Sequence, residues 1–273
     1  MYLSKEVWVS VVSKELEIGK FPMLPCSCCH RVLLQVKKEL VKLVEVVKRI
    51  PPDFSKLSSV ANGNLIDVLA AAAESISEAA TKRFRFSMAL TCQGCRETTM
   101  VVGDAKSHGA EGAPVYIRVK SAWPELHVFE LKSAYPSSVI SELKKSFIPF
   151  LRAPTSAGSR ARTAIEVLLD ELSVTRVRTQ DDGQVKRKQN GAPLKLSLGE
   201  RLKELEKKDL YVAKLLGAIK QLGNEATHGR DLPYADLLDA FDLIHHVLEE
   251  LYVERPKRHH KIQTSNQMAQ KYQ

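Results

Sequence analysis

The sequence lacks any apolar run close to the roughly eighteen residues that a membrane-spanning helix needs. Its first apolar stretch contains Lys5 and Glu6, which excludes a secretory signal of the usual kind. Also absent are a phosphate-cradling glycine loop, a nucleophile elbow and a paired-carboxylate signature, so a small-molecule enzyme has little support. We therefore expect a globular cytoplasmic protein with no membrane contact and no small-molecule cofactor.

Cysteine is also scarce, with five residues in 273, and the odd count argues against a disulfide framework. Four of the five form two C-x-x-C pairs, Cys26 with Cys29 and Cys92 with Cys95. Two residues between thiolates allow a turn to direct both sulfurs at one ion, and two such turns complete a tetrahedral shell. The spacing predicts one structural zinc ion bound by Cys26, Cys29, Cys92 and Cys95.

The sequence also allows other ligands for the zinc ion. Cys28 lies inside the first pair, and either His30 or His108 could replace one thiolate. We favour the two C-x-x-C pairs because C-x-C is the rarer arrangement. A closed shell of four cysteines leaves no position for a substrate, so the metal is expected to stabilise the fold without taking part in catalysis.

Acidic residues are too few to balance the basic ones, and the net charge is +9. Residues 173–196 and 255–273 together account for the whole excess. Such segments either contact polyanions such as RNA or DNA or are simply solvated, and no aromatic residues alternate with the basic ones to favour base stacking. Candidate nucleic-acid contacts are Arg176, Arg178, Lys186, Arg187 and Lys188.

Hydrophobic periodicity divides the chain near Pro136, where the apolar spacing changes from that of strands to that of helices. The first domain, 1–135, is predicted to contain a short helix after Ser4, a helical insertion at about 36–81 that begins with an amphipathic helix over 32–50, and strands that include 126–131. The second domain, 136–254, is predicted to be helical, with a capping box at Ser197 and a protruding hairpin over 173–196. A basic, disordered tail is expected over 255–273.

Asn224 and His228 lie one helical turn apart between two helical stretches, in the sequence LGNEATHG. An imidazole exchanges protons near neutral pH, and a neighbouring amide can orient it or bind a phosphate oxygen. The pair is therefore the best catalytic candidate. The alternative interpretation is that both residues close a helix end and have a structural role only.

With these motifs in view, the chain resembles bacterial proteins that carry the domain-of-unknown-function family 4145, a HEPN-like helical domain often preceded by a zinc-ribbon-like segment. The resemblance rests on the C-x-x-C pairs, the helix SAGSRARTAIEVLLDEL and the segment IKQLGNEATHG. It implies an α+β protein with two parts: a zinc-ribbon-type N-terminal domain with a helical insertion, and a HEPN-like all-α helical bundle that forms a homodimer.

The same resemblance implies a nucleic-acid-linked or partner-docking role, with phage defence or restriction as a setting. It also implies an alternative function, a metal-independent endoribonuclease that cleaves RNA with His228 and Asn224. The motif arginine of such enzymes is replaced here by Gly223, which supplies no charge to a phosphate. We therefore expect weak or absent cleavage.

Overall fold

The computed structural model describes residues 5–12, 16–46, 70, 81–108, 112–180, 182–227 and 232–271. They form two compact units that divide between Pro124 and Glu125. None of the described helices is both long and apolar enough to cross a membrane.

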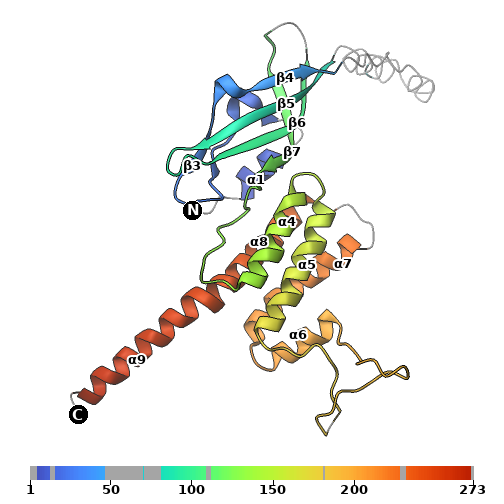
Figure 1. Cartoon of the computed structure of the whole chain (residues 1–273), viewed down its shortest axis with the longest axis vertical. Coiled ribbons are helices and arrows are strands. Elements are labelled where there is room, and N and C mark those ends of the chain that lie inside the picture. The colour runs from blue at the N-terminus through green and yellow to red at the C-terminus, as the bar shows by residue number, and fades with distance from the viewer. Residues whose placement is uncertain are drawn as a thin grey trace. The chain divides into compact units, whose positions relative to one another are not determined.

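The first unit is built on a curled, seven-stranded antiparallel sheet (Figure 1). Its strand order is β1-β7-β6-β5-β3-β2, and β4 also pairs with β5. Helix α1 (Lys5–Val12) precedes the sheet. The strands are β1 (Leu16–Glu17), β2 (Leu24–Pro25), β3 (Leu33–Val36), β4 (Lys42–Glu45), β5 (Thr81–Cys92), β6 (Thr98–His108) and β7 (Val115–Trp123), with short 3-10 helices η1 (Ile18–Lys20) and η2 (Lys38–Leu40).

Alternation along β5, β6 and β7 separates a buried face from an open face. Phe86, Met88, Val101, Ile117 and Val119 are buried, whereas the residues between them are largely accessible to solvent. Period-two alternation of this kind is what a sheet with one solvated face requires. The open face of these three strands is therefore available for binding.

This architecture corrects the prediction of a zinc-ribbon-type domain with a helical insertion. The predicted amphipathic helix over 32–50 is wrong where it is described, because β3 and β4 pair there with the two ends of β5. The backbone ladder with β5 determines the structure of this segment, although its apolar residues also fit a helical period. The rest of the predicted insertion, over 47–80, lies outside the described residues apart from Ala70.

The second unit is predominantly helical. It contains α4 (Ser137–Phe150), α5 (Pro154–Glu171), α6 (Leu198–Glu206), α7 (Leu210–Thr227), α8 (Tyr234–Glu249), a π-helical turn η3 (Glu250–Glu254) and α9 (Arg255–Lys271). Phe147 forms edge-to-face contacts with Phe129 and Phe241, each with ring centroids 5.3 Å apart. These rings lie in the core of the unit, and aromatic pairs of this geometry contribute beyond the area they bury.

Three further expectations differ from the structure of this unit. The HEPN-like all-α bundle is wrong, because the helices here are accompanied by a β-bridged protrusion between α5 and α6 and by an irregular segment before α4. Residues 126–131 form no strand; Leu126, Val128 and Phe129 are buried. Residues 255–271, expected to be disordered, continue the chain of α8 and η3 as the helix α9, which buries no side chain.

The capping box at the start of α6 is confirmed. The Ser197 hydroxyl accepts the backbone N–H of Glu200, and the Glu200 carboxylate accepts the backbone N–H of Ser197 at 2.8 Å. This reciprocal pair satisfies two donors at the helix start that would otherwise have no partner.

Candidate functional site

The two C-x-x-C segments form the turns of two neighbouring hairpins. The first connects β2 to β3, and the second connects β5 to β6. Strand β3 pairs with β5 so that Leu34 lies opposite Cys92. The sheet register therefore brings the two turns, here called the knuckles, side by side.

The sulfur atoms of Cys26, Cys29, Cys92 and Cys95 all lie within 4.8 Å of one another. The Cys26 Sγ to Cys95 Sγ distance and the Cys29 Sγ to Cys92 Sγ distance are both 3.6 Å. Sulfurs bound tetrahedrally to one ion at about 2.3 Å would be separated by about 3.8 Å. The cluster therefore has the dimensions of a four-thiolate metal site.

Backbone geometry is the same in both knuckles. His30 and Arg96, each directly after the second cysteine of its pair, have left-handed φ values of 53° and 63°. Each donates its backbone N–H to the carbonyl of the first cysteine, Cys26 or Cys92, at 3.0 Å. Left-handed backbone is uncommon for residues other than glycine and persists only where surrounding contacts hold it. Because both knuckles have this conformation at the same position, we infer that both turns position their cysteines in the same way.

Backbone N–H groups are directed at the sulfurs. Those of Gly94 and Cys95 donate to Cys92 Sγ at 3.4 and 3.5 Å. In the first knuckle, the backbone N–H of Arg31 is the main cause that lowers the pKa of the Cys29 thiol to about 6, whereas burial raises the pKa of Cys26 to about 12. Metal coordination would keep a buried thiolate such as Cys26 deprotonated.

Among the described residues, the alternative ligands do not belong to this cluster. Cys28 is exposed and is not one of the four residues whose sulfurs converge. His30 is not among them either. His108 instead has its Nδ1 atom 2.9 Å from the Thr81 hydroxyl, at the far end of β5 and β6.

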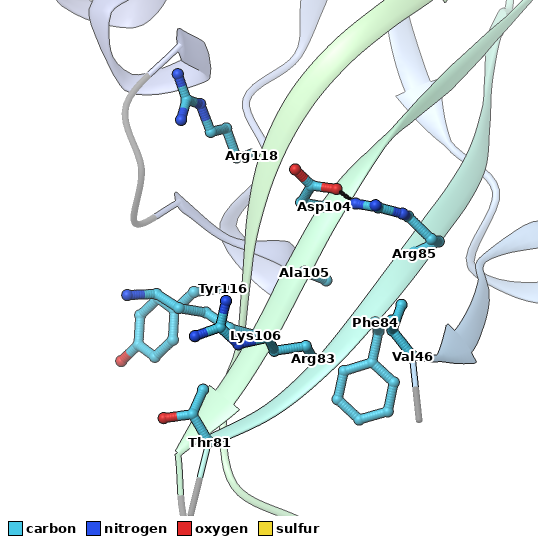
Figure 2. A pocket seen from close by; sticks show the side chains of 10 residues that line it. All are labelled: Val46, Thr81, Arg83, Phe84, Arg85, Asp104, Ala105, Lys106, Tyr116 and Arg118. Carbon is cyan, nitrogen blue, oxygen red and sulfur yellow. Dashed lines mark ion pairs between the residues drawn. The ribbon is translucent and has the colours of Figure 1, made fainter. Parts of the chain in front are cut away.

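A groove of about 590 Å³ lies on the sheet, over β5, β6 and β7 (Figure 2). The strand register arranges its polar residues in two rows. Arg85, Asp104 and Arg118 lie opposite one another across the three strands, and so do Arg83, Lys106 and Tyr116. Phe84, Ala105, Val46 and Thr81 complete the lining.

Positive charge predominates in this groove. Four of the lining residues are basic and one, Asp104, is acidic. Asp104 forms an ion pair with Arg85, drawn as a dashed line in Figure 2, and a longer one of 3.8 Å with Lys120. Arg83 and Lys106 lie directly opposite each other, so the register places two cations next to one another on the sheet.

This groove was not predicted from the sequence. Basic and apolar residues alternate in the β5 sequence TKRFRF, which was the only local signal. The partners Lys106, Tyr116 and Arg118 come from two other strands, and only the sheet register brings them next to Arg83 and Arg85. Aromatic and basic residues therefore do meet in this protein, although not along one segment.

The predicted catalytic pair lies only partly within the described residues. Asn224 lies in α7, which continues through Gly223 to Thr227 with no break at the glycine. His228 lies outside the described residues. The endoribonuclease interpretation of the pair therefore stays a prediction.

The predicted nucleic-acid contacts all lie on the protrusion between α5 and α6. Arg176 and Arg178, at its base, form ion pairs with Asp170 and Glu200. Lys186, Arg187 and Lys188, in its middle, are exposed. The structure therefore separates these five basic residues into two groups with different surroundings.

Comparison with known proteins matches residues 147–268 to the family described as "Domain of unknown function (DUF4145)". The match begins inside α4 and ends inside α9, so the matched residues lie in the helical part of the chain. No curated protein and no solved structure matches the chain.

Proposed function

We propose that this protein binds single-stranded nucleic acid in the groove on β5, β6 and β7. The observation that supports this most directly is the placement of Arg83 opposite Lys106, beside Tyr116 in the same row. Two neighbouring cations attract a phosphate backbone, and the tyrosine ring would offer a surface on which a base can stack.

The lining favours a single strand over a duplex. Tyr116 is partly accessible and shares one row with two cations. Unpaired bases can reach such a ring, whereas the bases of a duplex are already stacked on one another. The combination of a basic groove with an aromatic ring is typical of surfaces that bind single strands with little sequence preference.

The test compares a groove variant with a charge-matched control. Fluorescence anisotropy would follow the binding of labelled oligouridine and oligothymidine over a series of salt concentrations. The Arg83→Thr/Lys106→Thr variant is expected to bind more weakly and to lower the slope of log affinity against log salt by roughly 1.4. The Lys38→Thr/Lys42→Thr control, which changes charge outside the groove lining, is expected to retain the native slope.

The stacking role of Tyr116 gives the same experiment a second readout. Tyr116→Leu is expected to weaken binding roughly tenfold, because stacking on an aromatic side chain contributes about 1–3 kcal/mol per base. Tyr116→Phe retains the ring and should bind almost as the native protein does. Equal salt slopes for the groove variant, the control and the native protein would refute the proposal.

We further propose that the cysteine cluster binds one zinc ion, which stabilises the sheet. A cluster of four cysteine thiolates suits zinc or an iron–sulfur centre, and zinc is the usual occupant of two paired knuckles. A site closed by four protein ligands contributes directly to folding.

Metal analysis of the purified protein is expected to find one equivalent of zinc. Cys92→Ser should lose the metal and lower the melting temperature, because Cys92 is buried and its sulfur belongs to the cluster. Cys28→Ser is the matched control, since this exposed cysteine lies outside the cluster, and it should retain both properties. Iron in place of zinc, or a Cys92→Ser protein that keeps its metal, would contradict the assignment.

A further inference from the structure

Residues 176–196, here called the arm, form the protrusion between α5 and α6 and contain two hairpins instead of the single one predicted (Figure 1). Val177 bridges Lys195 at the base of the arm. Thr179 bridges Val185 in the first hairpin, and Arg187 bridges Pro193 in the second.

The arm has a closed hydrogen-bonded junction where its base and its two hairpins meet. The backbone N–H of Arg178 donates to the carbonyl of Leu194 at 2.9 Å, that of Leu194 donates to Lys186, and that of Lys186 donates to Arg178, both at 2.8 Å. These three hydrogen bonds close a ring that joins Arg178, Lys186 and Leu194. Each of the three strand segments is thereby tied to the other two.

Both hairpin turns use glycine in a left-handed conformation that favours this residue. Gly183 has a φ of 82° and Gly191 a φ of 78°. The side chain before each glycine accepts the backbone N–H after it: Asp182 accepts from Gln184 at 2.9 Å, and Asn190 accepts from Ala192 at 3.2 Å. Local hydrogen bonds of this type order a turn without help from a core.

Ion pairs attach the base of the arm to the helices on either side. Arg176 Nε donates to Asp170 at the end of α5 at 2.6 Å, and the buried Arg201 of α6 donates to the same carboxylate at 2.7 Å. Arg178 forms an ion pair with Glu200, whose carboxylate is also part of the capping box of α6. The hydrogen bond from Arg176 is the largest cause that lowers the pKa of Asp170, which keeps this carboxylate charged.

Three consecutive cations in the middle of the arm lie on both of its faces. Lys186, Arg187 and Lys188 are consecutive residues on the edge of the second hairpin, and consecutive side chains of an extended strand point to opposite faces. Arg187 also donates to the carbonyl of Gly191 at 2.8 Å, which directs its guanidinium along the hairpin. A ribbon with cations on both faces can contact two phosphate backbones at once.

We infer that the arm inserts into a groove of double-stranded nucleic acid and contacts the phosphates on both walls through Lys186, Arg187 and Lys188. The major groove of DNA admits a two-stranded β-ribbon, and its two walls are phosphate strands. The arm contains no aromatic residue, so it has no surface for stacking unpaired bases. This site is distinct from the groove on β5, β6 and β7.

The arm is already structured before it binds, which supports this role. A segment that folds only on binding loses conformational entropy at that step and binds more weakly for the same contacts. The junction, the two turns and the ion pairs at the base establish the shape of the arm beforehand. Contacts to phosphates alone would make its binding independent of base sequence.

The test uses the full-length protein and a labelled DNA duplex of about 20 base pairs, or two helical turns. The variant Lys186→Gln/Arg187→Gln/Lys188→Gln is expected to lower the salt slope for duplex binding by roughly 2.7, at about 0.9 per cation. The control Lys144→Gln/Lys203→Gln/Lys214→Gln removes the same charge from exposed positions on α4, α6 and α7 and should retain the slope. Single-strand binding should be the same in both variants.

A second variant tests the shape of the arm at constant charge. Gly183→Val/Gly191→Val retains every cation but places branched residues at positive φ, and it is expected to weaken duplex binding severalfold. Equal slopes for the arm variant and its control would overturn the inference. The inference would also be overturned if polyglutamate competed with the labelled duplex as strongly as unlabelled duplex does. That result would favour an acidic protein partner. Neither outcome affects the single-strand test of the groove.

Discussion

Gly94 lies in the second knuckle, next to Val32, which follows the first knuckle. A Cβ atom at this position would lie 2.8 Å from Cγ2 of Val32, closer than side-chain atoms are found in folded proteins. Any larger residue would therefore push the hairpin turn that carries Cys92 and Cys95 away from the one that carries Cys26 and Cys29. The absence of one carbon atom allows the two sulfur pairs to converge.

His245 is the residue through which acid should destabilise the helical unit. It lies in α8 with its ring 4.8 Å from that of Phe129, and burial is the main cause that lowers its pKa, although Glu249 at 3.8 Å opposes this. In the unfolded chain a histidine titrates at about 6.5. Below that pH the unfolded state binds a proton that the folded state resists, so the free energy of unfolding falls as the pH falls.

The measurement is the urea midpoint of unfolding at pH 7.5 and at pH 5.5. We expect the native protein to lose stability between these values and His245→Gln to lose less, since glutamine does not titrate. His259→Gln, which removes an exposed histidine from α9, is the control and should behave as the native protein does. A native protein as stable at pH 5.5 as at pH 7.5 would contradict this role for His245.

At the level of secondary structure, the sequence predicts most reliably the elements that bury a periodic apolar face. The segment SAGSRARTAIEVLLDEL was expected to form a helix, and α5 covers all of it except its last residue. The expected capping box at Ser197 was also right, because it is a local signal that needs no distant partner. Helices α4, α7 and α8 likewise lie within 136–254, the part of the chain that was predicted to be helical.

The errors fall where distant contacts decide the structure. Strand β4 exposes all four of its residues and is held by its pairing with β5, so its own sequence contains no period-two signal. The alternating residues Leu126 and Val128 predicted a strand, but in the segment that contains them Phe129 packs against Phe147 of α4 and Phe241 of α8. Local patterns indicate which residues are buried but not what covers them.

The same distinction applies to the candidate sites. The cysteine cluster was predictable because each C-x-x-C pair is a local motif, and the number of thiolates indicated that two pairs would meet. The groove was not predictable, because Arg83, Lys106 and Tyr116 lie on three strands whose register no local motif specifies. Two of the five predicted nucleic-acid contacts, Arg176 and Arg178, are bound to acidic residues at the base of the arm.

At the level of the whole molecule, the cysteine cluster lies entirely within the unit Glu6–Pro124. A strong chelator should therefore destabilise the sheet and leave the helices from Glu125 onward folded. We expect thermal unfolding in chelator to show an early transition with little loss of helical circular dichroism, followed by a later helical transition near its original temperature. A simultaneous loss of both signals would show that the two units unfold as one.

The cysteine cluster also has a consequence for the length of the chain between the two knuckles. The cluster joins Cys29 to Cys92, and thus closes a long loop that contains β3 and β4. The entropic cost of closing a flexible loop rises only with the logarithm of its length, by about 0.6 kcal/mol for each doubling. Once four thiolates fix the ends, residues can be added between β4 and β5 at little cost in stability. The sheet should therefore tolerate inserted sequence in this connection.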